Sequence, residues 1–215
     1  LMIKVLDACG LNQRFWVLAA ATTDRAYSVR VLDRATGEER TYHNPPGRRS
    51  PAILDTDAFD SCDAAARPAP SARTTPAAPA APAAPAAPAV HAIDRIPEAA
   101  NDCPDRRLCL ADGRYQVAMR WQDFQGVTDE ADPSPVRSAD SGLFTFFDPD
   151  NWELMVKVLD ACRVNGHVWI LGAATTNVGY DLVVTDTTTG VERTYANPVG
   201  QVSPAIIDIE AFACS

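Results

Sequence analysis

Motifs that mark the common enzyme families are missing from this sequence. It contains no Gly-x-Ser-x-Gly, no His-Glu-x-x-His, no phosphate-binding loop and no dinucleotide fingerprint. Histidine, the side chain most often used for acid–base catalysis, occurs only three times in 215 residues. We therefore expect a protein that is not an enzyme and that uses no cofactor.

A leader and a membrane span are also missing from the beginning of the sequence. Leu1 is followed by only a few apolar residues before Asp7, too short a stretch for a signal peptide or a transmembrane helix. Position 1 is not methionine. We expect any export signal to lie upstream of Leu1, and no part of the chain to insert into a membrane.

Positive charge is scarce in the second half of the sequence. The chain carries a net charge of −9. Residues 1–62 contain eight acidic and eight basic side chains, whereas residues 103–215 contain sixteen acidic and eight basic ones. Binding to phosphates needs the opposite sign, so this balance argues against nucleic acid or an anionic membrane as a partner.

What the sequence does contain is a duplication. Residues 1–60 align without a gap on residues 154–213, and 34 of the 60 positions are identical. Residues 103–153 have no counterpart ahead of Leu1. A repeat of this kind marks a structural module. We expect residues 1–62 to be the second half of one module and residues 103–215 to be one complete module.

Six cysteines form an even set, and they allow fifteen pairings. Only pairs inside the repeated segment satisfy the shorter copy by itself. The expected bonds are therefore Cys9–Cys62, Cys162–Cys214 and, from what remains, Cys103–Cys109. Metal ligation is the alternative, although the sequence has no Cys-x-x-Cys pair. Disulfides imply an oxidising compartment, which we expect to be the extracellular medium or a cell surface.

Residues 63–102 form a stretch rich in alanine and proline. From Pro76 to Pro88 a proline recurs at every third residue, which is the period of the polyproline II helix. Proline also prevents the α-helix that alanine would favour. We expect a semi-rigid linker between the two modules.

The rest of the sequence has the patterns of β-strands. Tyr115, Val117, Met119 and Trp121 alternate with charged, polar or small residues. Six further strands are expected near residues 143–147, 154–158, 168–171, 180–184, 191–195 and 205–209, with a hairpin turn at Asn165-Gly166. Seven short strands without a convincing helix predict an all-β fold, an antiparallel sandwich of the immunoglobulin or fibronectin type III kind.

The shorter copy holds only the last four or five of these strands. Alone it would have an open sheet edge and an uncovered apolar face, which invite pairing. We expect residues 1–62 to be completed by upstream residues, by the second module, or by strand exchange with another chain.

Candidate binding residues come from aromatic side chains and from polar loops that both copies share. Trp152 and Trp169 are candidates for stacking on sugars or anchoring a protein. The shared loops add the candidates Thr175, Thr176, Asn197, Pro198 and Gly200, because binding often evolves in such loops. Core packing and turn geometry are the alternative explanations for these residues.

Acidic side chains near one turn are a candidate for a metal site. Asp148, Asp150 and Glu153 offer oxygen ligands of the kind that Ca²⁺ prefers. No calcium loop of known spacing is present, and a turn rich in Asp and Asn explains the same residues. We therefore expect no bound metal.

The complete module contains the short motifs Asn151-Trp152-Glu153-Leu154, Val158-Leu159-Asp160 and Thr185-Asp186-Thr187. These motifs resemble an uncharacterised β-sandwich repeat domain of bacterial secreted and cell-surface multidomain proteins. The resemblance covers residues 103–215 and part of residues 1–62. It implies export and an accessory role beside other domains, and it carries no active site across.

Three functions compete at this point. The leading hypothesis is a non-catalytic secreted tandem module that binds a protein or a cell surface in an adhesion or accessory role. A secreted protease inhibitor that presents the loop 198–204 is the second. A carbohydrate-binding accessory domain, which would contact polysaccharide through Trp152 or Trp169, is the third.

Overall fold

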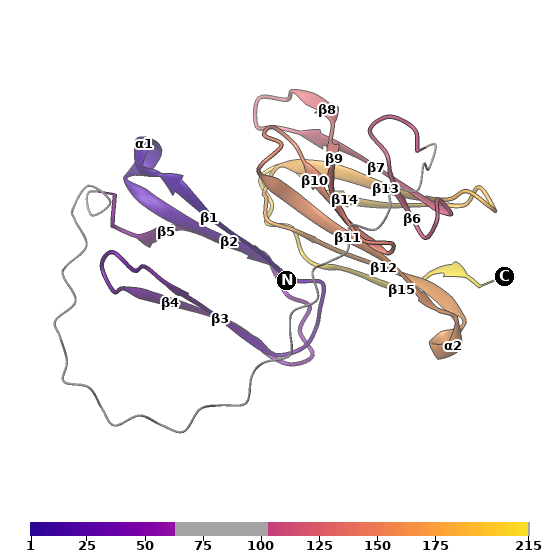
Figure 1. Ribbon diagram of the computed structural model, residues 1–215, viewed down its shortest axis with the longest axis horizontal. Helices are drawn as coiled ribbons and strands as arrows, with labels where there is room; N and C mark the ends of the chain where they lie inside the picture. Colours follow the sequence, from indigo (N-terminus) through magenta and orange to yellow (C-terminus); the bar gives the residue numbers. More distant parts are fainter. Residues whose placement is uncertain (63–102, 215) are drawn as a thin grey trace, which may run out of the picture.

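The computed structural model describes residues 1–62 and 103–214. The expected linker at residues 63–102 lies outside these described ranges. Within them the protein is all-β, with fifteen strands in antiparallel sheets and two helices of one turn each (Figure 1). No helix in the described part of the chain has the length and apolar character needed to cross a bilayer.

Residues 1–62 form two small sheets. The first has the strand order β1-β2-β5, and the second is the hairpin β3-β4. The elements are β1 (Met2–Ala8), α1 (Cys9–Asn12), β2 (Arg14–Ala20), β3 (Tyr27–Leu32), β4 (Glu39–Asn44) and β5 (Ile53–Phe59). A small core of Val17, Ala58 and Phe59 holds them together, and Val31 and Tyr42 of the hairpin pack against it.

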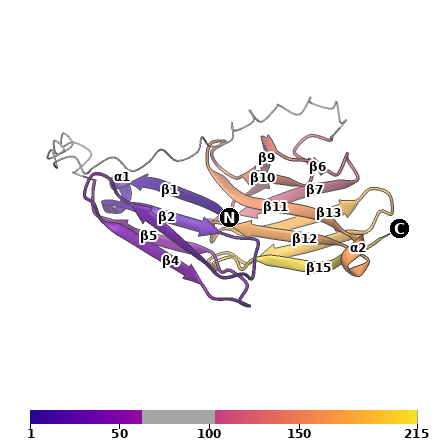
Figure 2. The ribbon, with the colours of Figure 1, turned by 60° about the horizontal axis from the view of Figure 1, so that its bottom comes forward.

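Residues 103–214 form two larger antiparallel sheets. One has the order β15-β12-β11-β10-β9, and the other has the order β14-β13-β7-β6 with β8 also paired to β7 (Figures 1 and 2). The elements are β6 (Leu108–Leu110), β7 (Tyr115–Gln122), β8 (Thr128–Glu130), β9 (Asp132–Arg137), β10 (Ser141–Thr145), β11 (Trp152–Ala161), α2 (Cys162–Asn165), β12 (His167–Ala174), β13 (Gly179–Asp186), β14 (Glu192–Asn197) and β15 (Ile206–Ala213).

The two large sheets share one apolar core. Alternate residues of each strand point into it because successive side chains of a strand lie on opposite faces. β7 contributes Val117 and Met119, β11 contributes Val156, and β13 contributes Leu182 and Val184, all buried. These apolar rows are the ones that the two-residue period of the sequence predicts.

The hairpin expected at Asn165-Gly166 is present, because β11 and β12 on either side of it pair antiparallel, but the expected two-residue type I′ turn is wrong. The chain there makes the one-turn helix α2, and Gly166 ends it with a left-handed backbone at φ 78°. The amide of Gly166 donates to the carbonyl of Cys162 at 3.1 Å, which closes the turn. The positive φ that suggested a tight hairpin turn instead terminates a helix, a role that glycine fills equally well.

Three strands of the complete module were not expected from the sequence. β6 and β8 have three residues each, and β9 contains Pro133 and Pro135. Strands this short leave little periodicity, and proline normally argues against a strand. β9 tolerates both prolines because it is the edge strand of its sheet.

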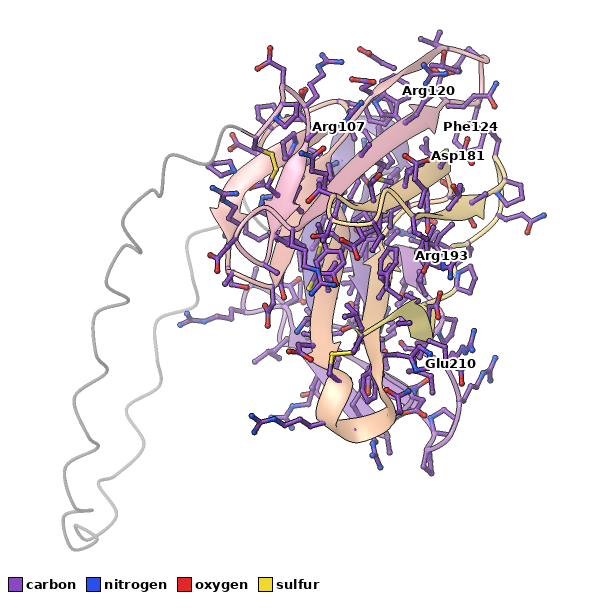
Figure 3. All side chains as sticks on the ribbon, turned by 90° about the vertical axis from the view of Figure 1, so that its right-hand side faces the viewer. Arg107, Arg120, Phe124, Asp181, Arg193 and Glu210 are labelled. Atoms are coloured by element: carbon purple, nitrogen blue, oxygen red, sulfur yellow. A yellow bond between two sulfur atoms is a disulfide. The ribbon has the colours of Figure 1, made fainter. Side chains whose placement is uncertain are left out.

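The structure has the three disulfides that the repeat favours (Figure 3). Cys9 pairs with Cys62, Cys103 with Cys109, and Cys162 with Cys214. The two long bonds fasten the end of the last strand of each copy to the one-turn helix of that copy. Three disulfides indicate that the protein folds in an oxidising environment.

Candidate functional site

The polar loops that the two copies share are held by internal hydrogen bonds. The buried amide of Asn197 donates to the carbonyl oxygens of Val178, Pro198 and Gln201 at 3.4, 3.2 and 2.9 Å. Its counterpart Asn44 makes the same three bonds in the first copy. An amide that satisfies three backbone carbonyls fixes the loop, and this explains its identity in both copies.

The other loop candidates divide by exposure. Thr175 and Thr176 are buried, and Thr176 accepts a hydrogen bond from the Val178 amide at 3.2 Å. Pro198 and Gly200 are exposed on the loop after β14. Gly200 has φ 83°, which only glycine adopts without strain. Of this set, only Pro198 and Gly200 offer surface to a partner.

The four tryptophans do not form one exposed row. Trp16 and Trp169 are half-buried, and each indole donates to the asparagine of the preceding one-turn helix, Asn12 or Asn165, at 3.0 Å. Trp152 is 37% exposed, while Trp121 is buried against Phe146 and Phe147. The indole of Trp169 therefore has a structural partner of its own.

The acidic candidates for calcium do not converge on one point. Asp148 accepts a hydrogen bond from the amide of Asp150 at 2.9 Å, as an Asp-initiated turn does. Glu153 is buried and lies against Lys4. Across the described residues, the single cluster of three possible metal ligands is Asp160 with Cys162 and Cys214. Its two sulfur atoms already form a disulfide.

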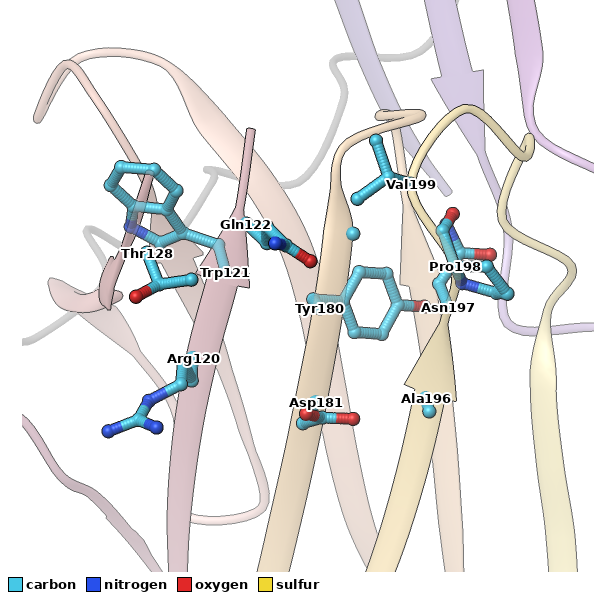
Figure 4. A pocket seen from close by; sticks show the side chains of 11 residues that line it. Arg120, Trp121, Gln122, Thr128, Tyr180, Asp181, Ala196, Asn197, Pro198 and Val199 are labelled. Carbon is cyan, nitrogen blue, oxygen red and sulfur yellow. The ribbon is translucent and has the colours of Figure 1, made fainter. Parts of the chain in front are cut away.

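A hollow of about 270 Å³ lies at the ends of β7, β13 and β14 (Figure 4). Trp121 and Thr128 line one side, and Pro198 and Val199 line the other. Pockets for small molecules usually enclose ~300–1,000 Å³. The hollow is smaller than that, and we assign it no ligand.

The two copies contact each other through a buried ion pair. Lys4 Nζ on β1 lies 3.3 Å from Glu153 Oε2 on β11 and donates to Asn151 Oδ1 at 2.8 Å. Burial lowers the pKa of the Lys4 ammonium and raises the pKa of the Glu153 carboxyl, and each charge opposes the shift of the other. Nothing in the sequence pattern paired these two residues.

A short strand bridge joins the same two copies. Pro51 pairs with Pro204 in antiparallel fashion. The amide of Ala52 donates to Ser203 O, and the amide of Ala205 donates to Ser50 O, both at 3.3 Å. Both serines are buried, and each forms a hydrogen bond with a tyrosine of its own copy, Ser50 with Tyr27 and Ser203 with Tyr180. The contact therefore rests on well-fixed backbone.

The first copy has an open apolar face on β1. In the complete module the corresponding side chains Leu154, Val156 and Val158 are at most 3% exposed. Their counterparts Leu1, Ile3 and Val5 are 55%, 43% and 52% exposed. The difference arises because the second sheet of the complete module covers this face, and its strands β6 and β7 have no counterpart in residues 1–62.

Two strand edges accompany the open face. β11 and β13 of the complete module pair with β10 and β7. Their counterparts β1 and β3 have no partner on that edge among the described residues. An unpaired edge presents a row of backbone donors and acceptors to an incoming strand. Face and edges together make the open half of residues 1–62 our candidate site.

Comparison with known protein families, with curated proteins and with solved structures gives no match.

Proposed function

We propose that this chain is a non-catalytic binding module of an exported protein, with an accessory or adhesion role. In this proposal each copy follows the immunoglobulin or fibronectin type III type of β-sandwich, complete in residues 103–215 and open in residues 1–62. Three disulfides support export. The shared polar residues Asn44 and Asn197 support a structural rather than catalytic use, because their amides are consumed by loop carbonyls.

The open face of β1 is the observation that carries the proposal. Ile3 and Val5 are about half exposed on a strand whose free edge can accept another strand. Binding by strand addition takes its affinity from backbone hydrogen bonds and its specificity from alternate side chains. The partner must therefore be an extended segment with an apolar row.

The complete module shows what such a partner looks like. β10 pairs with β11, and Phe144 of β10 is fully buried in the shared core. The fitting partner for β1 is a segment of the same character as residues 103–153. A second copy of this chain cannot supply it without loss, since each chain holds one such front half and two back halves. We therefore assign the partner to a front-half segment outside these 215 residues.

Strand addition is favoured over the inhibitor and carbohydrate hypotheses by two contacts. Ser203 to Ala205, at the end of the loop proposed for a protease, already bridges to residues 50–52. The indole of Trp169, one of the two tryptophans proposed for sugar stacking, donates a hydrogen bond to Asn165. The β1 face has no comparable partner within the described ranges.

A synthetic peptide of residues 138–148, which spans β10, tests the proposal. We expect it to bind the 215-residue chain and to protect the amides of β1 from hydrogen exchange. Val5→Asp should weaken binding at least tenfold, because it places a charge on the apolar face. Leu11→Asp is the matched control, since Leu11 is 79% exposed on α1, away from that face, and it should bind like the original chain.

A fused variant gives the second arm of the test. A copy of residues 103–153 placed directly before Leu1 supplies a front half through the same peptide connection that the complete module uses. The fused chain should no longer bind the peptide and should bind less of a dye that reports exposed apolar surface. Equal peptide binding by the original, Val5→Asp and fused chains would refute strand addition at this face.

A further inference from the structure

The bridge between the two copies joins equivalent positions of the repeat. Pro51 and Pro204 occupy the same place in the 60-residue alignment, and so do Ser50 and Ser203. The two hydrogen bonds, from the Ala52 amide to Ser203 O and from the Ala205 amide to Ser50 O, exchange under the same correspondence. A contact in which residue i meets its own counterpart has local two-fold symmetry.

Proline is chemically suited to the centre of this contact. The hydrogen bonds come from the residues flanking the pair, so Pro51 and Pro204 form a non-hydrogen-bonded antiparallel pair. The residue at such a position donates no hydrogen bond across the bridge, so proline fits there although it has no backbone N–H. The Ser-Pro-Ala sequence of both copies therefore fits a surface that pairs with itself.

The same symmetry relates the ion pair between the copies to a second, equivalent position. Lys4 corresponds to Lys157, so the symmetric partner of the Lys4–Glu153 ion pair is Lys157 with the position directly before Leu1. Residues 1–62 contain no counterpart of Glu153, so the present contact holds one of the two ion pairs of a symmetric arrangement.

The sheet faces beside the bridge also match. β2 contacts β12, and the buried alanines Ala20 and Ala173 of these strands are counterparts. Lys4 projects from β1 on the side opposite Ile3 and Val5, so this contact and the open face use different sides of one strand.

We propose that Glu153, Lys157 and Ser203 to Ala205 form a homotypic docking surface, whose partner is the same surface of a second copy of the complete module. In this chain residues 1–62 occupy the docking surface, because they repeat most of the second half of the complete module. Two complete modules would bury two Lys157–Glu153 pairs where the present contact buries one ion pair. The proposal concerns a different face from the strand-addition site and does not depend on it.

Displacing residues 1–62 from the docking surface tests the proposal in the full chain. Lys4→Glu sets a like charge against Glu153 and releases the docking surface, whether residues 1–62 swing away or unfold. The variant should then form a dimer, with a mass in equilibrium sedimentation that approaches twice the 23.1 kDa of one chain. The original chain at the same concentration should stay closer to one chain mass.

Two further variants locate the dimer contact. Lys4→Glu with Lys157→Glu leaves Glu153 without a cation across the axis, so dimerisation should weaken at least tenfold. Lys4→Glu with Pro204→Cys should form a disulfide between chains, because non-hydrogen-bonded pairs hold their Cα atoms ~4.5 Å apart, within reach of a disulfide. A Lys4→Glu chain that stays monomeric overturns the proposal, and so does a dimer that survives Lys157→Glu or resists the cross-link.

Discussion

The ammonium of Lys4 and the carboxylate of Glu153 lie 3.3 Å apart across the contact between the two copies, and each side chain is more than nine-tenths buried. Taking two charges out of water costs much of what their attraction returns. The pair therefore adds little net stability to the fold. Each charge nevertheless requires the other, because the opposite charge offsets the cost of burying it. Removing one partner leaves a buried charge that nothing compensates.

A double-mutant cycle measures this requirement. Lys4→Met should lower the free energy of unfolding, or open the contact, at a cost of about 3 kcal/mol, because Glu153 stays buried without its cation. Lys4→Met combined with Glu153→Met should recover most of that loss. Urea unfolding of the four chains gives the coupling energy. Losses that simply add would show that the two side chains act independently.

Removal of each disulfide should destabilise the protein according to the length of the loop it closes. Cys162→Ala with Cys214→Ala opens a loop with a sequence separation of 52 and should cost about 4 kcal/mol on the loop-entropy model. Cys103→Ala with Cys109→Ala opens one with a separation of 6 and should cost about 2 kcal/mol. Thermal unfolding under oxidising conditions compares them. A larger loss from the short loop would contradict the loop-length argument.

Alkaline pH should weaken the protein through Tyr195. Burial, followed by its 2.7 Å hydrogen bond to Asp208, raises the pKa of Tyr195 above its ordinary value of 10.0. Above pH 10 the unfolded chain loses this proton while the folded chain keeps it. The folded state then binds more protons, so the free energy of unfolding falls as the pH rises.

Tyr195→Phe isolates this effect. The variant loses one hydrogen bond, worth about 1 kcal/mol at neutral pH, but its stability should fall less steeply than that of the original chain above pH 10. Tyr42→Phe provides the parallel case, because Tyr42 donates to Asp55 in the same way in the first copy. Identical alkaline slopes for the Tyr195→Phe and original chains would contradict the assignment.

Gly142 should not tolerate a methyl group. A Cβ atom at this position would lie 2.5 Å from Leu108 Cδ2, inside the shared core. Gly142→Ala should therefore cost about 1–3 kcal/mol by overpacking, and adding Leu108→Ala should remove the steric part of that cost. Gly10→Ala is the control, because Gly10 has open space around it and lies in helix α1, where alanine is the better residue. Urea midpoints of these variants provide the measurement.

Much of the architecture is visible in the sequence because it depends on short-range periodicity and on the repeat. The alternation of Tyr115, Val117, Met119 and Trp121 identifies β7, and these four side chains are buried. The repeat also identifies the disulfide partners, since a bond inside the shared segment serves both copies. Both inferences compare residues within one copy or between aligned positions.

The contacts between the copies could not be predicted from periodicity or from the repeat. Lys4 and Asn151 are 147 positions apart, and an isolated lysine on a strand normally faces water. The polar candidates Thr175, Thr176 and Asn197 suggest an exposed loop, yet all three are buried. Hydrogen bonds with the backbone satisfy Thr176 and Asn197, and no sequence pattern predicts these bonds. Short strands such as β6 and β8 carry too few residues to show a period.

The antiparallel bridge at Pro51 and Pro204 has a consequence for larger assemblies. A head-to-tail contact leaves a fresh surface at each step and can propagate into a filament, whereas a contact about a two-fold axis consumes both surfaces at once. Single modules that associate in this way stop at pairs. One module therefore cannot grow into a fibre through this face alone, because each contact leaves no free copy of the surface.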